Sequence, residues 1–214
     1  MRILKTEQYI NEKLAIQPVT KDRLSKIMKE GPSVDENTRK FIKDNNLIWN
    51  LKTMSYDCDG DVKVSEDIVA GGKLKIRFGN IGGNFDCGNN SLTTLEGAPQ
   101  EVGGYFGCYD NNLTTLEGAP QKVGGHFSCS HNNLTTLEGA PQEVGGSFSC
   151  SSNKLTALEG APQEVGGMFD CSSNNLTTLE GAPQKVGGDF ICTGNTNLVL
   201  PKEIPSWVKG RIIR

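Results

Sequence analysis

Apolar side chains return at a fixed interval of 21 residues over 81–198, and this period dominates the chain. Each copy has a phenylalanine, a cysteine two residues later, and leucines five and eight residues after the cysteine, as in Phe106, Cys108, Leu113 and Leu116. A fixed period of this length is typical of a solenoid, in which each copy forms one coil and neighbouring coils bury a shared core. The pattern therefore predicts a repeat solenoid.

The spacing within one copy predicts a short strand at each phenylalanine. In Phe127-Ser128-Cys129 the first and third side chains point to one face of an extended chain, and the second points to the other. Stacked about 4.8 Å apart, such strands form one parallel sheet with the Phe, Cys, Leu, Val and Ala side chains in inward columns. Each buried Phe or Leu contributes roughly 1.5–3 kcal/mol, so repetition of a small core stabilises the array.

The polar and small residues that recur in every copy have predicted places on the coil. An asparagine stands three residues beyond each cysteine. We expect its amide to turn inward and to bond the backbone groups that leave the sheet. A proline, which lacks an N–H group, suits the side of the coil outside the sheet. The Gly-Gly pair before each phenylalanine predicts a bend or bulge that a β-carbon would obstruct.

The recurring positions of one copy are Val123, Phe127, Cys129, Asn132, Leu134 and Leu137. Their spacing resembles the leucine-rich repeat, with phenylalanine and cysteine in two of the leucine positions. The short period and the proline are similar to the compact bacterial-type repeats. Three residues instead of two separate the valine from the phenylalanine, so we expect a kinked approach to the strand. The resemblance implies a solenoid scaffold and does not identify a partner, because this fold serves many partners.

The segments that flank the repeats predict caps at both ends, since an open solenoid end would expose a sheet edge and the core. The N-terminal segment has helical periodicity, and the C-terminal segment is apolar around Trp207 and Val208. The predicted parts are a helical N-terminal cap (1–46), degenerate first coils (47–80), six repeats (81–198) and a C-terminal cap (199–214).

Helices are expected over residues 6–14, 20–30 and 35–45. The first twelve residues also resemble the short helix by which tailed bacteriophages send internal proteins into the prohead. In that family a protease cuts after a glutamate such as Glu30, which stands two positions after Met28. This resemblance implies a structural or packaged bacteriophage protein. An ordinary amphipathic cap helix explains the same residues and is the preferred interpretation.

Charge divides the chain into a basic and an acidic part. Residues 1–55 hold eleven Lys or Arg against seven Asp or Glu, whereas residues 81–197 hold three against twelve. The acidic array would repel a phosphate backbone, which argues against nucleic acid binding on the repeat face. No apolar run approaches a membrane span, and Lys5 and Glu7 interrupt any signal-peptide core. The sequence thus predicts a cytoplasmic protein without a membrane partner.

Candidate chemistry is sparse. Cys129 should point inward while His131 lies beyond the strand, so a thiolate–imidazole pair is hard to build. The six repeat cysteines are interpreted as reduced packing residues. The glutamate column that begins at Glu96 is interpreted as a solvated ridge, with a cation site as the alternative. We therefore expect no cofactor, no metal and no enzymatic activity; an enzyme acting from the sheet face is a distant alternative.

The positions that differ among the copies predict a recognition surface on the outward side of the strand. They include both histidines and two of the four tyrosines of the chain. Tyrosine and histidine beside small serines are typical of recognition surfaces. Asp110 and His131 share a column one coil apart, which predicts a hydrogen bond between them. The candidate binding residues are Tyr105, Tyr109, Asp110, His126, His131, Met168 and Asp170.

These observations together predict a non-enzymatic module for protein–protein interaction. The partner is expected to be a protein that binds the solvent-facing side of the repeat sheet. Self-association of the array is a further interaction that the sequence allows.

Overall fold

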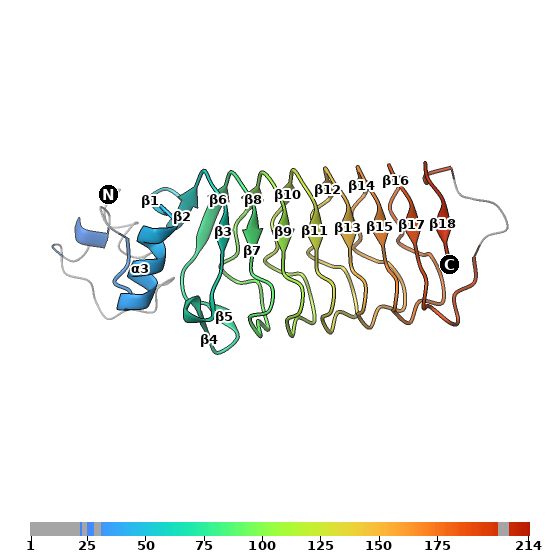
Figure 1. Cartoon of the computed structure of the whole chain (residues 1–214), viewed down its shortest axis with the longest axis horizontal. Helices are drawn as coiled ribbons and strands as arrows, with labels where there is room; N and C mark the ends of the chain where they lie inside the picture. The colour runs from blue at the N-terminus through green and yellow to red at the C-terminus, as the bar shows by residue number, and fades with distance from the viewer. Residues whose placement is uncertain (1–21, 23–24, 28–30, 201–205) are drawn as a thin grey trace, which may run out of the picture.

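Each 21-residue copy folds into one coil, and the coils stack along a single axis (Figure 1). The computed structural model describes residues 22, 25–27, 31–200 and 206–214. Within them, most strands are parallel and helix is confined to the N-terminal third. The predicted repeat solenoid, mainly of parallel strands, is confirmed.

Every coil contributes two short strands, so the coils form two sheets instead of the single sheet predicted. In the repeats, sheet A passes through the valine column and sheet B through the phenylalanine column. Sheet A contains β1 (Ile48–Asn50), β2 (Ser55–Cys58), β6 (Phe78–Ile81), β8 (Glu101–Val102), β10 (Lys122–Val123), β12 (Glu143–Val144), β14 (Glu164–Val165) and β16 (Lys185–Val186). Sheet B contains β3 (Val62–Lys63), β7 (Phe85–Asp86), β9 (Phe106–Gly107), β11 (Phe127–Ser128), β13 (Phe148–Ser149), β15 (Phe169–Asp170), β17 (Phe190–Ile191) and β18 (Ile212–Ile213).

The Gly-Gly pair forms the corner between the two strands of a coil. Gly124 donates a hydrogen bond to the Val102 carbonyl at 2.9 Å, and Gly125 donates to Gly104 at 3.0 Å, so the ladder between coils continues round the corner. A β-carbon on Gly124 would collide with the carbonyl oxygen of Gly103 in the preceding coil, an approach that only glycine permits. The predicted bend is confirmed. The second strand was missed because two residues are too few to show an alternating pattern.

Six phenylalanine rings stack along the interior of the solenoid. Neighbouring ring centroids lie 5.1 to 5.8 Å apart, with interplanar angles of 6° to 26°. The stack ends edge-on at both sides, against Phe78 at 4.9 Å from Phe85 and against Trp207 at 5.3 Å from Phe190. The cysteine column and nearly all of the leucine, valine and alanine columns are buried beside it, as predicted.

The N-terminal end of the solenoid is covered by helix α3 (Glu36–Asp44) (Figure 1). The Asp35 carboxylate accepts a hydrogen bond from the Thr38 N–H at 2.8 Å and caps the helix. Phe41 packs edge-on against Phe78, with ring centroids 6.3 Å apart. This helix agrees with the prediction over 35–45. The predicted helix over 6–14 lies outside the described residues, and the described part of 20–30 is helical.

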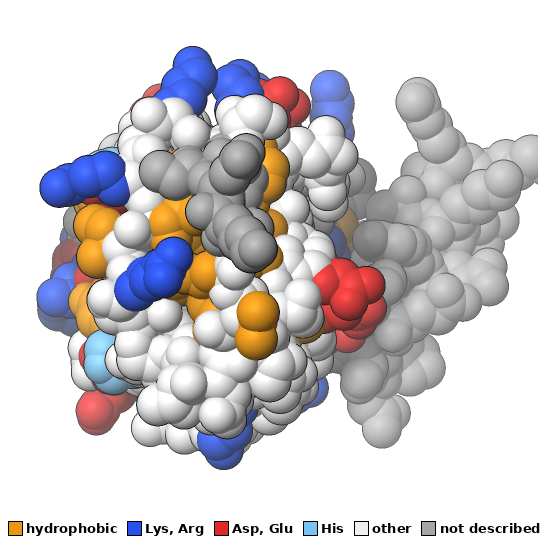
Figure 2. Space-filling model, turned by 90° about the vertical axis from the view of Figure 1, so that its right-hand side faces the viewer, with side chains coloured by type: hydrophobic (Ala, Val, Ile, Leu, Met, Phe, Trp, Pro, Cys, Tyr) orange, Lys and Arg blue, Asp and Glu red, His pale blue; other side chains and the backbone are white. Residues whose placement is uncertain are grey.

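Two irregular segments complete the fold. Between β3 and β6 the chain forms the 3₁₀ helix η1 (Glu66–Ile68) and an antiparallel hairpin of β4 (Val69–Ala70) and β5 (Lys73–Leu74). At the C-terminal end, β18 pairs with β17, and Val208 bridges to Val186. Seen from this end, hydrophobic side chains lie near the centre, and basic side chains lie both beside them and toward the rim (Figure 2).

The repeated asparagines form a buried ladder between coils. The Asn132 amide nitrogen donates to the carbonyls of Cys129 at 3.1 Å and Ser130 at 3.2 Å in its own coil, and of Cys108 at 3.0 Å in the preceding coil. Its side-chain oxygen accepts from the Leu113 N–H at 3.0 Å. One amide thus satisfies backbone groups in two coils, as the sequence predicts.

Replacement of Asn132 with alanine should lower the free energy of unfolding by about 2–4 kcal/mol, because several buried backbone groups lose their partner. Chemical denaturation followed by circular dichroism measures this change. The control is Asn133→Ala, whose side chain makes no hydrogen bond within the described part of the chain; its effect should stay within about 0.5 kcal/mol. Equal effects of the two variants would contradict the ladder's structural role.

The six repeat cysteines should be unreactive toward Ellman's reagent at pH 8 in the native protein. They are free thiols buried in the core, and burial raises the thiol pKa well above its usual range, as at Cys108 and Cys129. In denaturant all six should react. Rapid labelling of several repeat cysteines without denaturant would show that the solenoid opens readily.

Candidate binding face

Sheet B has three outward positions on each coil of the six repeats, and we call this surface the sheet-B face. The three positions precede the phenylalanine, follow it, and follow the cysteine. From the first to the sixth copy they are Asn84, Asp86 and Gly88; Tyr105, Gly107 and Tyr109; His126, Ser128 and Ser130; Ser147, Ser149 and Ser151; Met168, Asp170 and Ser172; and Asp189, Ile191 and Thr193.

The two tyrosines of the second copy lie over glycines. A β-carbon on Gly88 would stand 2.5 to 2.8 Å from three atoms of the Tyr109 ring, so this ring covers the site where every later copy has a side chain. Tyr105 extends over Gly107 in the same way, with its hydroxyl group above that glycine. The Tyr109 hydroxyl donates to Asp86 Oδ2 at 3.3 Å, which ties the ring to the preceding coil.

Both phenol groups keep their protons at neutral pH. Burial raises the pKa of Tyr109, and the carboxylates of Asp86 and Asp110 raise it further. The pKa of Tyr105 is also raised, first by burial and then by Asp86. The tyrosines therefore offer neutral rings and hydroxyl donors in a negatively charged environment.

The position before the phenylalanine has a structural role in most coils. Its side chain accepts a hydrogen bond from the backbone N–H at the same corner of the next coil, as in Asn84 to Tyr105 at 2.7 Å and His126 Nδ1 to Ser147 at 2.8 Å. Tyr105 and Met168 do not accept such a bond within the described residues. His126 is therefore explained by the backbone, whereas Tyr105 and Met168 are not.

The residue after the outward positions adopts a left-handed backbone conformation in all six copies. Its φ is 49° at Asp110, 54° at His131 and 73° at Gly194. Asn, Asp, His and Gly are the residue types that tolerate this region, so the backbone accounts for Asp110 and His131. The hydrogen bond predicted between these two side chains is not among the bonds of the described residues.

A hydroxyl network occupies the middle of the sheet-B face. Ser130 and Ser149 lie 2.8 Å apart, Ser149 and Ser151 lie 3.3 Å apart, and Ser149 reaches Asp170 at 3.5 Å. The network separates two groups of predicted binding residues. Tyr105, Tyr109, Asp110, His126 and His131 belong to two adjacent coils, whereas Met168 and Asp170 lie two coils beyond the histidines, about 10 Å away.

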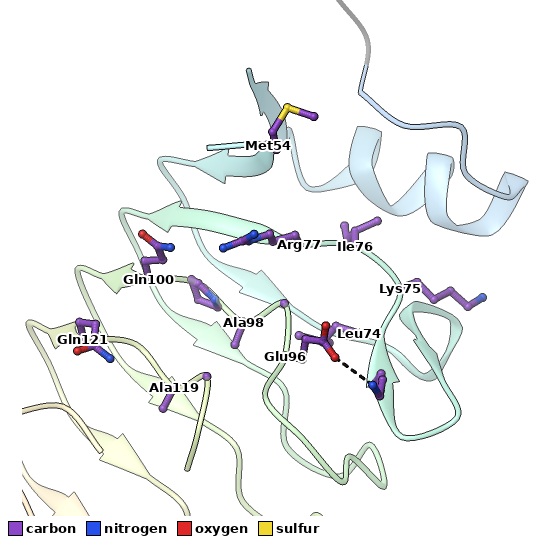
Figure 3. Close-up of a pocket in the computed structure, with 14 residues that line it drawn as sticks. Met54, Leu74, Lys75, Ile76, Arg77, Glu96, Ala98, Gln100, Ala119 and Gln121 are labelled. Atoms are coloured by element: carbon purple, nitrogen blue, oxygen red, sulfur yellow. Dashed lines mark hydrogen bonds and ion pairs between the residues drawn. The ribbon is translucent and has the colours of Figure 1, made fainter. Parts of the chain in front are cut away.

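A cavity of about 790 Å³ lies beside the first coils and contains none of the predicted binding residues. Its lining runs from β5 to Arg77 and includes Met54 and the Gly-Ala-Pro corner of the first copy (Figure 3). Lys73 and Glu96 form an ion pair there at 3.0 Å.

The described residues hold no group of three or more His, Cys, Asp or Glu arranged to bind a metal ion. Cys129 is buried and its thiol donates a hydrogen bond to the Ser149 carbonyl at 3.4 Å, whereas His131 is exposed. Among the helices that the structure describes, none is long and apolar enough to span a membrane. Comparison with protein-family profiles, curated proteins and solved structures finds no match.

The pattern of variable positions did not predict that the tyrosine rings lie over Gly88 and Gly107. The available signal was the coincidence of glycine with tyrosine at neighbouring outward positions, where the other copies have mainly Ser or Asp.

The left-handed position predicts a stabilising substitution at Ser152, whose φ is 56°. Ser152→Asn should raise the free energy of unfolding by about 0.5–1 kcal/mol, because asparagine tolerates this conformation better than serine. Thermal unfolding measures the change. Ser152→Thr is the matched control and should destabilise, since β-branched residues are disfavoured there. The same sign for both variants would contradict the backbone explanation.

Proposed function

We propose that the protein is a non-enzymatic interaction module that binds a protein partner on the sheet-B face. The observation that carries this proposal is where the repeats differ. The position before the phenylalanine has six different residues in six copies. Exposed columns elsewhere on the coil are identical in five successive copies, namely the threonine column from Thr93 to Thr177, the glutamate column from Glu96 to Glu180 and the glutamine column from Gln100 to Gln184.

Neutral substitution at exposed positions does not explain why the copies differ mainly on the sheet-B face. Drift would have altered the exposed Thr, Glu and Gln columns as readily as the sheet-B face. Outside that face and the left-handed position, the first five copies differ at only three exposed or half-exposed columns, represented by Asn112, Thr115 and Lys122 in the second copy. Variation concentrated on one face is what selection for a particular partner produces.

Some of the candidate binding residues have a role in the backbone structure, and the others remain as the candidate site. His126, Asp110 and His131 are accounted for by the corner hydrogen bond and the left-handed position. Tyr105, Tyr109 and Met168 have no such account. Met168 is 47% exposed, whereas the other large apolar side chains of the repeats (81–198) are buried or half-buried. We therefore assign most of the binding energy to the two tyrosines, with Met168 as a second contact.

Two finer proposals accompany this function. Membership of the leucine-rich repeats is supported by the buried asparagine ladder that follows each sheet-B strand, and a cytoplasmic location by the free cysteines. A packaged bacteriophage protein is the alternative function. It predicts a mature mass that corresponds to cleavage after Glu30, which intact mass spectrometry of the natural protein measures.

Alanine at Tyr105 and Tyr109 together should weaken partner binding at least tenfold, because aromatic side chains dominate recognition energies. An affinity pull-down with mass spectrometry identifies the partner, and calorimetry measures its affinity for each variant. The matched control is Thr114→Ala with Gln121→Ala, in the same coil but on constant exposed columns. Circular dichroism checks that each variant is folded. Loss of affinity only in the control variant would place the binding surface elsewhere.

A further inference from the structure

We infer that Tyr105 and Tyr109 form a shelf for an arginine side chain of the protein partner. The inference rests on the proposed function and specifies the chemistry that this part of the sheet-B face recognises. Three features carry it: the way the tyrosines are seated, the charge around them, and the distribution of basic side chains on the face.

The Tyr109 ring is seated against the sheet and is only half-buried. The ring atoms Cε1, Cζ and Cε2 stand 2.5 to 2.8 Å from the point where a β-carbon of Gly88 would be, so one face of the ring lies against the sheet. The Tyr109 side chain as a whole is half-buried, so part of the ring remains accessible to a ligand. The bond from the Tyr109 hydroxyl to Asp86 holds the ring in place. A ring held before binding loses little conformational entropy when a ligand stacks on it.

The charge around the rings favours a cation. Asp86 accepts hydrogen bonds from the Gly88 N–H at 2.9 Å and from the Tyr109 hydroxyl, but forms no ion pair within the described residues. The exposed Asp110 follows Tyr109 directly and also forms none. A cation above an aromatic ring is attracted by the ring's negative face, and carboxylates at its edge add to that attraction.

Between Lys63 and Arg211, the described part of the sheet-B face has no lysine or arginine. Arg211 is paired with Asp189 at 2.9 Å, at the far end of the face. Lys63 stands beside Asp86 in register but forms no ion pair with it in the described structure. The carboxylates beside the two tyrosines are thus available to a cation that a partner supplies.

Arginine fits this shelf better than lysine. A guanidinium group is planar and stacks on an aromatic ring while its edge still donates hydrogen bonds. A lysine ammonium group is compact and strongly hydrated, so it gains less from the ring face. Stacking on Tyr109 would leave the guanidinium edge free to donate to Asp86 or Asp110.

The test uses the full ¹⁵N-labelled chain and three tripeptide amides, acetyl-Gly-Xaa-Gly with arginine, lysine or citrulline as the central residue. Citrulline has nearly the shape of arginine without its charge. We expect the arginine peptide to shift the amide signals around residues 86–110, to bind several-fold more tightly than the lysine peptide, and to lose binding as salt rises. Equal binding of the citrulline peptide would overturn the inference.

Variants distinguish the contribution of the Tyr109 ring to peptide binding from the contribution of the acidic charge of the sheet-B face. Gly88→Ala should displace the Tyr109 ring and weaken the arginine peptide about tenfold, as should Tyr109→Ala. Tyr109→Phe keeps the ring and should stay within about threefold of the natural chain. Gly60→Ala is the matched control, because a β-carbon there meets its nearest atom at 3.9 Å. Lys63→Ala should strengthen binding, since it removes a competing cation beside Asp86.

The outcomes distinguish this inference from the function on which it rests. If the natural partner depends on the two tyrosines but the arginine peptide does not bind, the arginine shelf is wrong and the binding module stands. If neither depends on them, both fail. Unchanged peptide affinity in folded Gly88→Ala and Tyr109→Ala chains also overturns the shelf.

Discussion

The buried asparagine ladder is the constraint on which the rest of the structure depends. Each amide bonds backbone groups of its own coil and of the preceding one, so two coils cannot slide past each other without leaving buried groups unpaired. This requirement keeps the coils in register. Because equivalent residues then stack directly, the phenylalanine rings of the six repeats meet face to face. A repeat with a different period would lose both interactions at once.

The same register produces columns on the surface, and the columns differ in how much freedom they have. The Gly-Gly corner is held by close backbone approach, and the left-handed position accepts only a few residue types without strain. The position before the phenylalanine is favoured as an acceptor for the next coil. Variation on the sheet-B face is therefore partly directed by the backbone, and residues that break these local rules are the informative ones.

Tyr105 and Tyr109 are such residues. Tyr105 gives up the hydrogen bond that Asn84 and His126 make at the equivalent corners, and Tyr109 occupies space over a neighbouring coil that is free because residue 88 is glycine. Tyr109 adds a hydrogen bond to Asp86 in the preceding coil, but neither tyrosine takes part in the asparagine ladder or the phenylalanine stack. Together with the acidic surroundings, they give the second coil a pair of outward tyrosines that the other copies lack, and this difference is the physical basis of the proposed recognition site.

The sequence alone determined the solenoid, the inward columns, the asparagine ladder and the helix at residues 35–45, because each depends on spacing along the chain. Only the tertiary structure decided that each coil has two strands, since a two-residue strand such as β10 carries no periodicity. It also decided that Asp110 and His131 occupy left-handed positions. The position of the Tyr109 ring over Gly88 was also decided only by the tertiary structure. Contact between coils depends on the direction in which a side chain leans, and spacing along the chain does not specify that direction.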